Sequence, residues 1–153
     1  MTMRTALLAL PALLLAAPAT LAHENHGHAS HPLVDARMGG MTMMVSTMGQ
    51  VSRTAEGEGS VARAAFPASG LALFARSLPA LFAPETAEAA ETRALPAIWA
   101  DSAGFAAQVA EFAAATAALE AAARADDREA FTAALARTKN ACQACHTSYR
   151  AEP

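Results

Sequence analysis

The apolar positions of this chain recur mainly at helical spacing. In the first regular segment, one arginine and a set of apolar side chains fall three or four residues apart and therefore share one helical face: Val34, Arg37, Met38, Met41, Met44, Val45, Met48 and Val51. The Gly- and Glu-rich stretch at residues 56–60 indicates a loop. The pattern therefore predicts a first helix that begins near Pro32 and ends at this loop.

Three further segments show the same period. The second is less regular, with Pro67 expected near its start and Pro79 expected to end it. Its apolar positions are Leu71, Phe74, Leu78, Leu81 and Phe82. A third helix is expected to begin near Pro96 and to bury Ile98, Phe105, Val109, Phe112, Ala115 and Leu119. In a fourth, Asp127 is the expected N-cap, and the inward face carries Phe131, Leu135, Thr138, Cys142, Cys145 and Tyr149.

These four amphipathic segments define the expected fold. No stretch alternates with the period of two that a β-strand requires. Four helices joined by mostly short connections predict an all-α protein, an antiparallel up-down-up-down four-helix bundle. We assign this bundle to residues 32–153 as one domain.

The N-terminal segment predicts export. A positive charge at Arg4, an apolar run over residues 6–17 and small residues up to Ala22 are typical of a secretory signal peptide over residues 1–22. An uncleaved membrane anchor is the alternative, and no later membrane span is expected. Residues 23–31 form a His-rich tail, and its histidines either bind a divalent metal or simply solubilise the chain: His23, His26, His28 and His31. A periplasmic location follows from the signal peptide.

Charge and cysteine content narrow the class further. The formal net charge of −3 argues against a nucleic-acid-binding protein, which normally carries a basic stripe. The two cysteines lie three residues apart, so a disulfide between them would close only a very short loop and stabilise little. These cysteines therefore need another role.

That role is indicated by the sequence Cys142-Gln143-Ala144-Cys145-His146. C-x-x-C-H is the attachment pattern for one covalent haem c, with His146 as the iron ligand. On a helix the three side chains share one face, so both sulfurs reach one macrocycle while the imidazole points to its iron. A redox-active dithiol or a zinc site are the alternatives. The first usually opens a helix next to strands, and the second needs a fourth ligand.

Haem attachment near the C-terminus of a four-helix chain resembles the class II c-type cytochromes, the cytochrome c′ family. Other stretches that carry the resemblance are Arg37-x-x-x-Met41, residues 96–101 (PAIWAD) and residues 142–150 (CQACHTSYR). The resemblance implies a left-handed bundle in which the first helix covers the distal side of the iron. The second helix matches the family pattern poorly.

The residue facing that distal side divides the family by function. The resemblance implies an apolar side chain over a vacant site in the gas-binding members, and a methionine ligand in the low-spin ones. Met41 falls at this position and is the predicted sixth ligand; another methionine of the stripe or an open site are the alternatives. Met44 lies about 60° around the helix from Met41 and is predicted to contact the haem, whereas Met43 points nearly opposite.

Two arginines are further candidates. The resemblance implies that Arg37 lies near the haem propionates, where its guanidinium can pair with a carboxylate; a solvated surface cation is the alternative. Arg150 either supports the surroundings of His146 or acts as a cation at the helix C-terminus. We also expect a space requirement at Gly39-Gly40, since glycine permits close approach to the macrocycle.

These features favour an electron-transfer protein that exchanges electrons with redox partner proteins. No residue pattern of an enzyme active site is present, so catalysis is not expected. A gas-binding protein for nitric oxide or carbon monoxide is the alternative, and a metal-handling protein acting through its histidine tail is a more distant one. The chain is expected to be a monomer or a homodimer.

Overall fold

The structure of the chain, a computed structural model, describes residues 31–90 and 92–152. The chain there forms α1 (Pro32–Glu56), η1 (Val61–Ala64), α2 (Ala65–Leu81), η2 (Pro84–Thr86), α3 (Ala97–Ala100), α4 (Ser102–Arg124) and α5 (Arg128–Tyr149). The predicted signal peptide and residues 23–30 of the predicted tail lie outside the described residues. His31 belongs to the bundle instead, because it is the N-cap of α1 and its Nδ1 accepts a hydrogen bond from the Leu33 amide at 3.2 Å.

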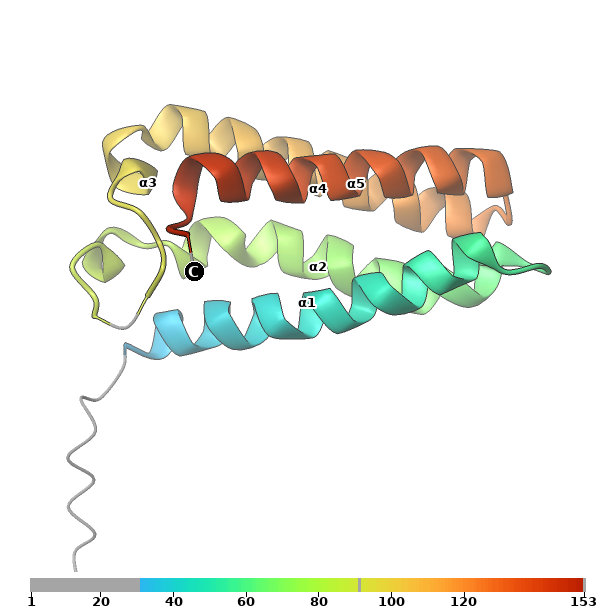
Figure 1. Cartoon of the computed structure of the whole chain (residues 1–153), viewed down its shortest axis with the longest axis horizontal. Coiled ribbons are helices and arrows are strands. Elements are labelled where there is room, and N and C mark those ends of the chain that lie inside the picture. The colour runs from blue at the N-terminus through green and yellow to red at the C-terminus, as the bar shows by residue number, and fades with distance from the viewer. Residues whose placement is uncertain (1–30, 91, 153) are drawn as a thin grey trace, which may run out of the picture.

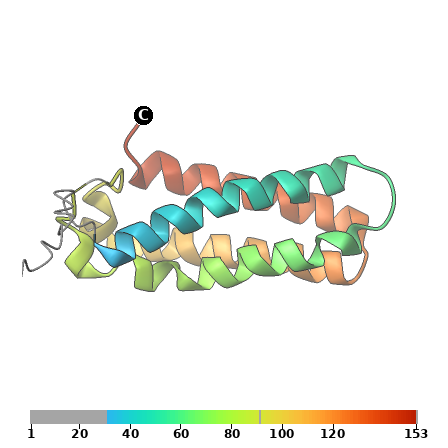
Figure 2. The ribbon, with the colours of Figure 1, turned by 90° about the horizontal axis from the view of Figure 1, so that it is seen from below.

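The four long helices α1, α2, α4 and α5 run side by side in alternating directions, as Figures 1 and 2 show. Helix α4 packs against both α2 and α5, and α1 packs mainly against α2. No strand occurs within residues 31–90 and 92–152, where the β pairing is a single isolated bridge between Ala94 and Arg150. The predicted all-α four-helix bundle is confirmed.

One predicted helix is divided in two. The pattern from Pro96 onward predicts a single third helix, but the chain bends at Asp101 and forms α3 and then α4. The Asp101 carboxylate accepts a hydrogen bond from the Gly104 amide at 3.1 Å and is the N-cap of α4. The periodicity is unaffected by this break, because Ile98 and the predicted positions of α4 are all buried. A side-chain cap therefore competes with continuation of the helix at this position.

Helix α2 continues through a proline that was expected to end it. Pro79 lies inside α2, which ends two residues later at Leu81. By length and composition alone, the stretch Val61–Leu81 is apolar enough to cross a membrane, and it is the one such stretch in the described part of the chain. Here it packs against α4 and α1 as a helix of the bundle.

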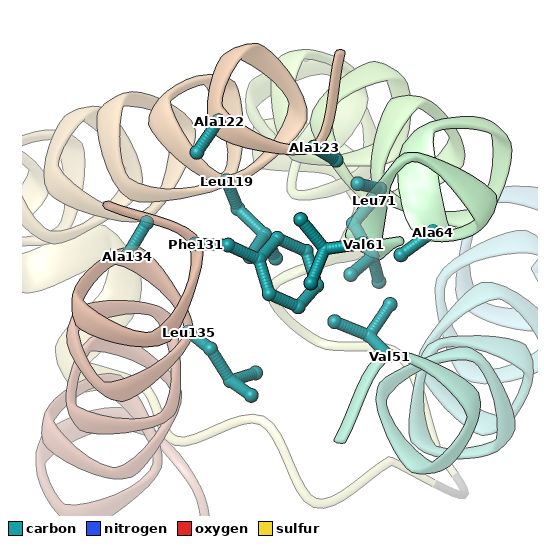
Figure 3. Packing of buried hydrophobic residues seen from close by; sticks show 11 residues of the cluster. Val51, Val61, Ala64, Leu71, Leu119, Ala122, Ala123, Phe131, Ala134 and Leu135 are labelled. Atoms are coloured by element: carbon teal, nitrogen blue, oxygen red, sulfur yellow. The ribbon is translucent and has the colours of Figure 1, made fainter. Parts of the chain in front are cut away.

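The buried residues form two clusters, one toward each end of the bundle. The cluster around Phe131 is drawn in Figure 3. It lies at the end of the bundle where α1 connects to η1 and α4 connects to α5, and it draws residues from η1 and from all four long helices. Val61 and Leu119 approach the Phe131 ring in that view, and all three are essentially inaccessible to solvent. The second cluster includes Leu78, Phe105 and Tyr149, and both cysteines pack against it. The apolar core is therefore closed at one end and borders the candidate site at the other.

Candidate functional site

The last turns of α5 bring the C-x-x-C-H side chains to one face. Cys142, Cys145 and His146 are all half-buried, and both cysteines are free thiols. Burial raises the pKa of both cysteine thiols. The pKa of His146 is lowered first by burial and then by the nearby positive charges of Arg150 and Arg93. Both effects favour the neutral imidazole, which is the form that binds a metal.

Two alternatives to haem attachment fit this setting poorly. Thiols that act in redox exchange have lowered pKa values and commonly lie at a helix N-terminus. Cys142 and Cys145 instead lie in the C-terminal part of α5, and their thiol pKa values are raised. Within residues 31–90 and 92–152 no group of three or more His, Cys, Asp or Glu side chains is placed to hold a metal ion.

These three side chains line a pocket of about 580 Å³ between α1, α2, α4 and α5. This volume falls within the range of about 300–1,000 Å³ that is usual for cofactor sites. Its walls are largely apolar and include Leu78, Ile98, Phe105 and Val109. The pocket can therefore hold a large flat apolar group beside two thiols and one imidazole.

The methionines of α1 occupy different places around this pocket. Met41 and Met44 are half-buried, line the pocket, and pack against the same core cluster as the two cysteines. Met38 and Val45 also line the pocket, as their place on the same helical face predicts, but they are 49% and 75% exposed. Met43 is 72% exposed and does not line the pocket, in agreement with its expected direction.

Arg37 also lines the pocket, yet it is only 3% exposed and is held by protein groups. Its Nη1 donates to the Thr86 hydroxyl at 2.9 Å and to the Leu81 carbonyl at 3.3 Å. Its Nη2 donates to the Thr92 hydroxyl at 2.9 Å, and the guanidinium carbon lies 4.7 Å from the centre of the Phe82 ring. Arg37 therefore fastens the connection after α2 to the first helix.

That connection reaches the C-terminal residues on the far side of the pocket. The Leu95 amide donates to the Tyr149 carbonyl at 3.0 Å, and the Ala151 amide donates to the Arg93 carbonyl at 2.8 Å. The Arg93 side chain donates through Nε to the Ala151 carbonyl at 3.0 Å. These bonds bring Arg93 and Arg150 to one edge of the pocket, beside His146.

Some of these contacts have no signal in the sequence. Thr86 and Thr92 lie in a stretch without a periodic pattern, and nothing local marks them as partners of Arg37. A further contact joins Tyr149 to Asp101, since the phenol donates to Asp101 Oδ2 at 3.0 Å. The space at Gly40 is taken by the Phe74 ring, which a Cβ there would overlap, whereas nothing lies within 4 Å of a Cβ at Gly39. The predicted space requirement therefore concerns helix packing at Gly40.

Two half-buried thiols and an imidazole at the end of the last bundle helix, beside an apolar pocket, fit a covalently attached haem. The fold and this site define a class, the c-type cytochromes built as four-helix bundles with the attachment motif near the C-terminus. Known proteins agree with this assignment: residues 32–150 match the family model of cytochrome c′. The chain belongs to the cytochrome c′ family, whose members bind one covalent haem c with its iron.

Individual cytochromes c′ resemble this chain with sequence identities of 30%, 33% and 35%. Cytochrome c′ of Rubrivivax gelatinosus is 33% identical over 119 residues, which cover 76% of this chain and 92% of the relative. Cytochrome c′ of Cereibacter sphaeroides is 35% identical over 153 residues, which cover 97% and 98% of the two chains. The solved cytochrome c′ of Thermochromatium tepidum is 30% identical with a TM-score of 0.72, and covers 78% of this chain and 95% of that one.

Proposed function

We propose that this protein is a periplasmic electron carrier whose haem iron is held between His146 and Met41. The observation that carries the proposal is the position of Met41, which faces the same pocket as Cys142, Cys145 and His146 and packs against the same core cluster. A thioether is a soft ligand suited to haem iron, and a Met/His pair raises the reduction potential. The neighbouring Met44 then contacts the cofactor without binding its iron.

The chain's own residues supply attachment, ligation and shielding. The thiols of Cys142 and Cys145 would hold the haem by adding across its two vinyl groups to give two thioether bonds, and His146 would offer a neutral imidazole nitrogen from the same helix face. When bound, the haem supplies a one-electron redox couple. The apolar walls exclude water from the pocket, and Arg37 holds the connection after α2 in place with neutral oxygen atoms as partners. None of these three roles requires a catalytic group, as we propose for an electron carrier.

The ligand assignment is tested with the holoprotein variant Met41→Ala. We expect the visible spectrum to change from low-spin to high-spin, and carbon monoxide to bind the reduced protein readily, because removal of the thioether opens the sixth position. Met43→Ala is the matched control, since this exposed methionine of the same helix does not line the pocket. It should leave the spectrum unchanged. A spectrum that stays the same in Met41→Ala would refute the assignment.

A gas-binding function is the second candidate, and one observation favours it. Variants of cytochrome c′ from Alcaligenes xylosoxidans, a structural neighbour with a TM-score of 0.71 and 28% identity, have been solved as nitric oxide complexes. If the wild-type protein itself has a high-spin spectrum and binds carbon monoxide readily, Met41 is not a ligand. The function is then gas binding in an open distal site.

Export and assembly complete the proposal. The N-terminal pattern supports cleavage after Ala22 and haem attachment in the periplasm. Intact-mass measurement of the purified protein would reveal a retained N-terminal segment or a missing haem.

Pairing of two copies is suggested by Phe66 and Leu73, which are 89% and 64% exposed and lie seven residues apart on one side of α2. A neighbouring solved cytochrome c′, 28% identical, shows ligand-controlled dimer dissociation.

A further inference from the structure

Among the described residues, the charged side chains that line the pocket are all positive. Arg37, Arg93, Lys139 and Arg150 line it, and no Asp or Glu among the described residues does. Arg37 is buried, whereas the other three are exposed and form what we call the cationic rim, defined as Arg93, Lys139 and Arg150. The chain as a whole carries a formal net charge of −3, so this concentration of positive charge runs against the overall balance.

The rim is assembled by the fold from three separate segments. Arg93 comes from the connection after η2, Lys139 from the middle of α5, and Arg150 from its C-terminal end. The isolated bridge between Ala94 and Arg150 brings the first and last of these together. Arg93 is further fixed because its side chain donates to the neutral carbonyl of Ala151.

The lining of the pocket, which is the cationic rim together with Arg37, retains an excess of positive charge when the site is filled. The two propionates of a haem offset at most two of the four cations that line the pocket. The nearby carboxylate of Asp101 does not line the pocket and accepts a hydrogen bond from Tyr149. A local field of this kind steers charged partners to one face of a protein, and its effect falls as salt is added.

We infer that the cationic rim is the docking surface for the negatively charged face of a redox partner protein. This inference rests on the electron-carrier function proposed above, and it adds the place of docking and the charge of the partner. Complementary charge mainly increases the rate of encounter and selects the orientation that brings the cofactor edge to the partner. One electron passes in each encounter, so the protein and its partner change charge by one unit in opposite directions.

The test uses two oxidants of opposite charge on the reduced holoprotein. One electron leaves the protein in each case, reducing hexacyanoferrate(III) to hexacyanoferrate(II), or tris(1,10-phenanthroline)cobalt(III) to its cobalt(II) form. With a cationic rim, the stopped-flow rate with hexacyanoferrate(III) falls as ionic strength rises, and the rate with the cobalt complex increases. The formal net charge of −3 predicts the reverse for both reagents, and that result would overturn the inference.

Lys139→Gln locates the effect. At an ionic strength of about 10 mM we expect about a two- to threefold slower reaction with hexacyanoferrate(III) and a faster one with the cobalt complex. A shift in reduction potential alone would move both rates in the same direction. Arg63→Gln is the matched control, because Arg63 is exposed in η1 at the opposite end of the bundle. Equal effects of the two variants would refute a local rim.

A macromolecular probe separates a protein partner from a membrane surface. We expect reduced flavodoxin, an acidic electron-transfer protein, to reduce the ferric holoprotein at a rate that falls with salt and with Lys139→Gln. Salt-sensitive binding to phosphatidylglycerol vesicles, together with no salt effect on the flavodoxin reaction, would assign the rim to lipid and overturn the inference. These rates are measurable whether or not Met41 binds iron. The test of the cationic rim is therefore independent of the test of Met41 as the iron ligand.

Discussion

At the scale of single residues, Asp126 shows how one carboxylate joins two connections. It lies in the turn before α5 with φ 55°, a left-handed conformation that Asp tolerates better than most residues. Its Oδ1 accepts hydrogen bonds from the Ser60 hydroxyl at 2.9 Å and from the amides of Val61 and Ala62 at 2.7 and 3.1 Å. The loop after α1 and the turn before α5 are therefore held by the same side chain.

These hydrogen bonds make part of the stability depend on pH. They hold the pKa of the Asp126 carboxyl below its usual value, with the Ser60 bond as the largest cause. A pKa that is lower in the folded state stabilises the protein above the unfolded-state pKa of about 3.9, and this contribution disappears as the pH falls through the folded-state value. We expect Asp126→Ala to lower Tm by about 3–6 °C at pH 7 and by less near pH 2, where the cost of a positive φ for alanine remains but the contribution of the ionised carboxylate is reduced.

The control for this prediction is Asp126→Asn, measured by circular dichroism under the same conditions. Asn also tolerates a positive φ and retains an oxygen acceptor, so its loss at pH 7 should be smaller. A difference between wild type and Asp126→Ala that is the same at both pH values would contradict a role for the ionised carboxylate.

At the scale of elements, two adjacent glycines in α1 have opposite roles. A Cβ at Gly40 would overlap the Phe74 ring of α2, whereas a Cβ at Gly39 meets nothing within 4 Å. Of these two positions, therefore, only Gly40 lies where α1 and α2 approach closely.

Alanine substitution separates the two roles. Gly39→Ala should stabilise the holoprotein by about 0.5–1 kcal/mol, since it removes a helix-weakening glycine without a steric cost. Gly40→Ala should destabilise it by about 1–3 kcal/mol, because Phe74 must move. Urea unfolding followed by circular dichroism measures both changes. Equal effects at the two positions would show that Phe74 does not pack on α1 in this way.

A second junction fixes the end of α5 that carries His146. The Tyr149 phenol donates to Asp101, and the Tyr149 ring packs edge-on against Phe105 with ring centroids 5.3 Å apart. Gly104 has no room for a side chain, since a Cβ would meet both Asp101 and Tyr149. The break between α3 and α4 thus gives the last turn of α5 a firm support.

At the scale of the whole molecule, apolar surface remains on α2. Phe66 and Leu73 are exposed although both are large and apolar. If this surface joins two copies, Phe66→Glu should convert a dimer into a monomer, because a carboxylate would be buried against an apolar face. Sedimentation equilibrium measures the mass directly. The control Ala133→Glu adds the same charge at an exposed position of α5, and a dimer that survives Phe66→Glu would contradict this interface.

The sequence alone was enough to predict the four long amphipathic segments and the attachment motif, but not the break between α3 and α4 or the course of α2 through Pro79. Helical periodicity is a local property, so the buried positions of α4 and the N-cap at Asp127 could be predicted before any packing was known. The C-x-x-C-H motif is local as well, because three side chains within one turn share a face in any helix. The haem-binding class therefore followed from residues 142–146.

Only the tertiary structure decided what surrounds that motif. The partners of Arg37 lie 44 to 55 residues away in the chain, and two of them lie in a connection without periodic pattern. The exposure of Met38, the pairing of Gly40 with Phe74 and the meeting of Arg93 with Arg150 likewise depend on contacts between distant segments. A one-dimensional pattern records which face a residue occupies on its own helix, whereas the neighbours on that face are set by how the helices and connections pack.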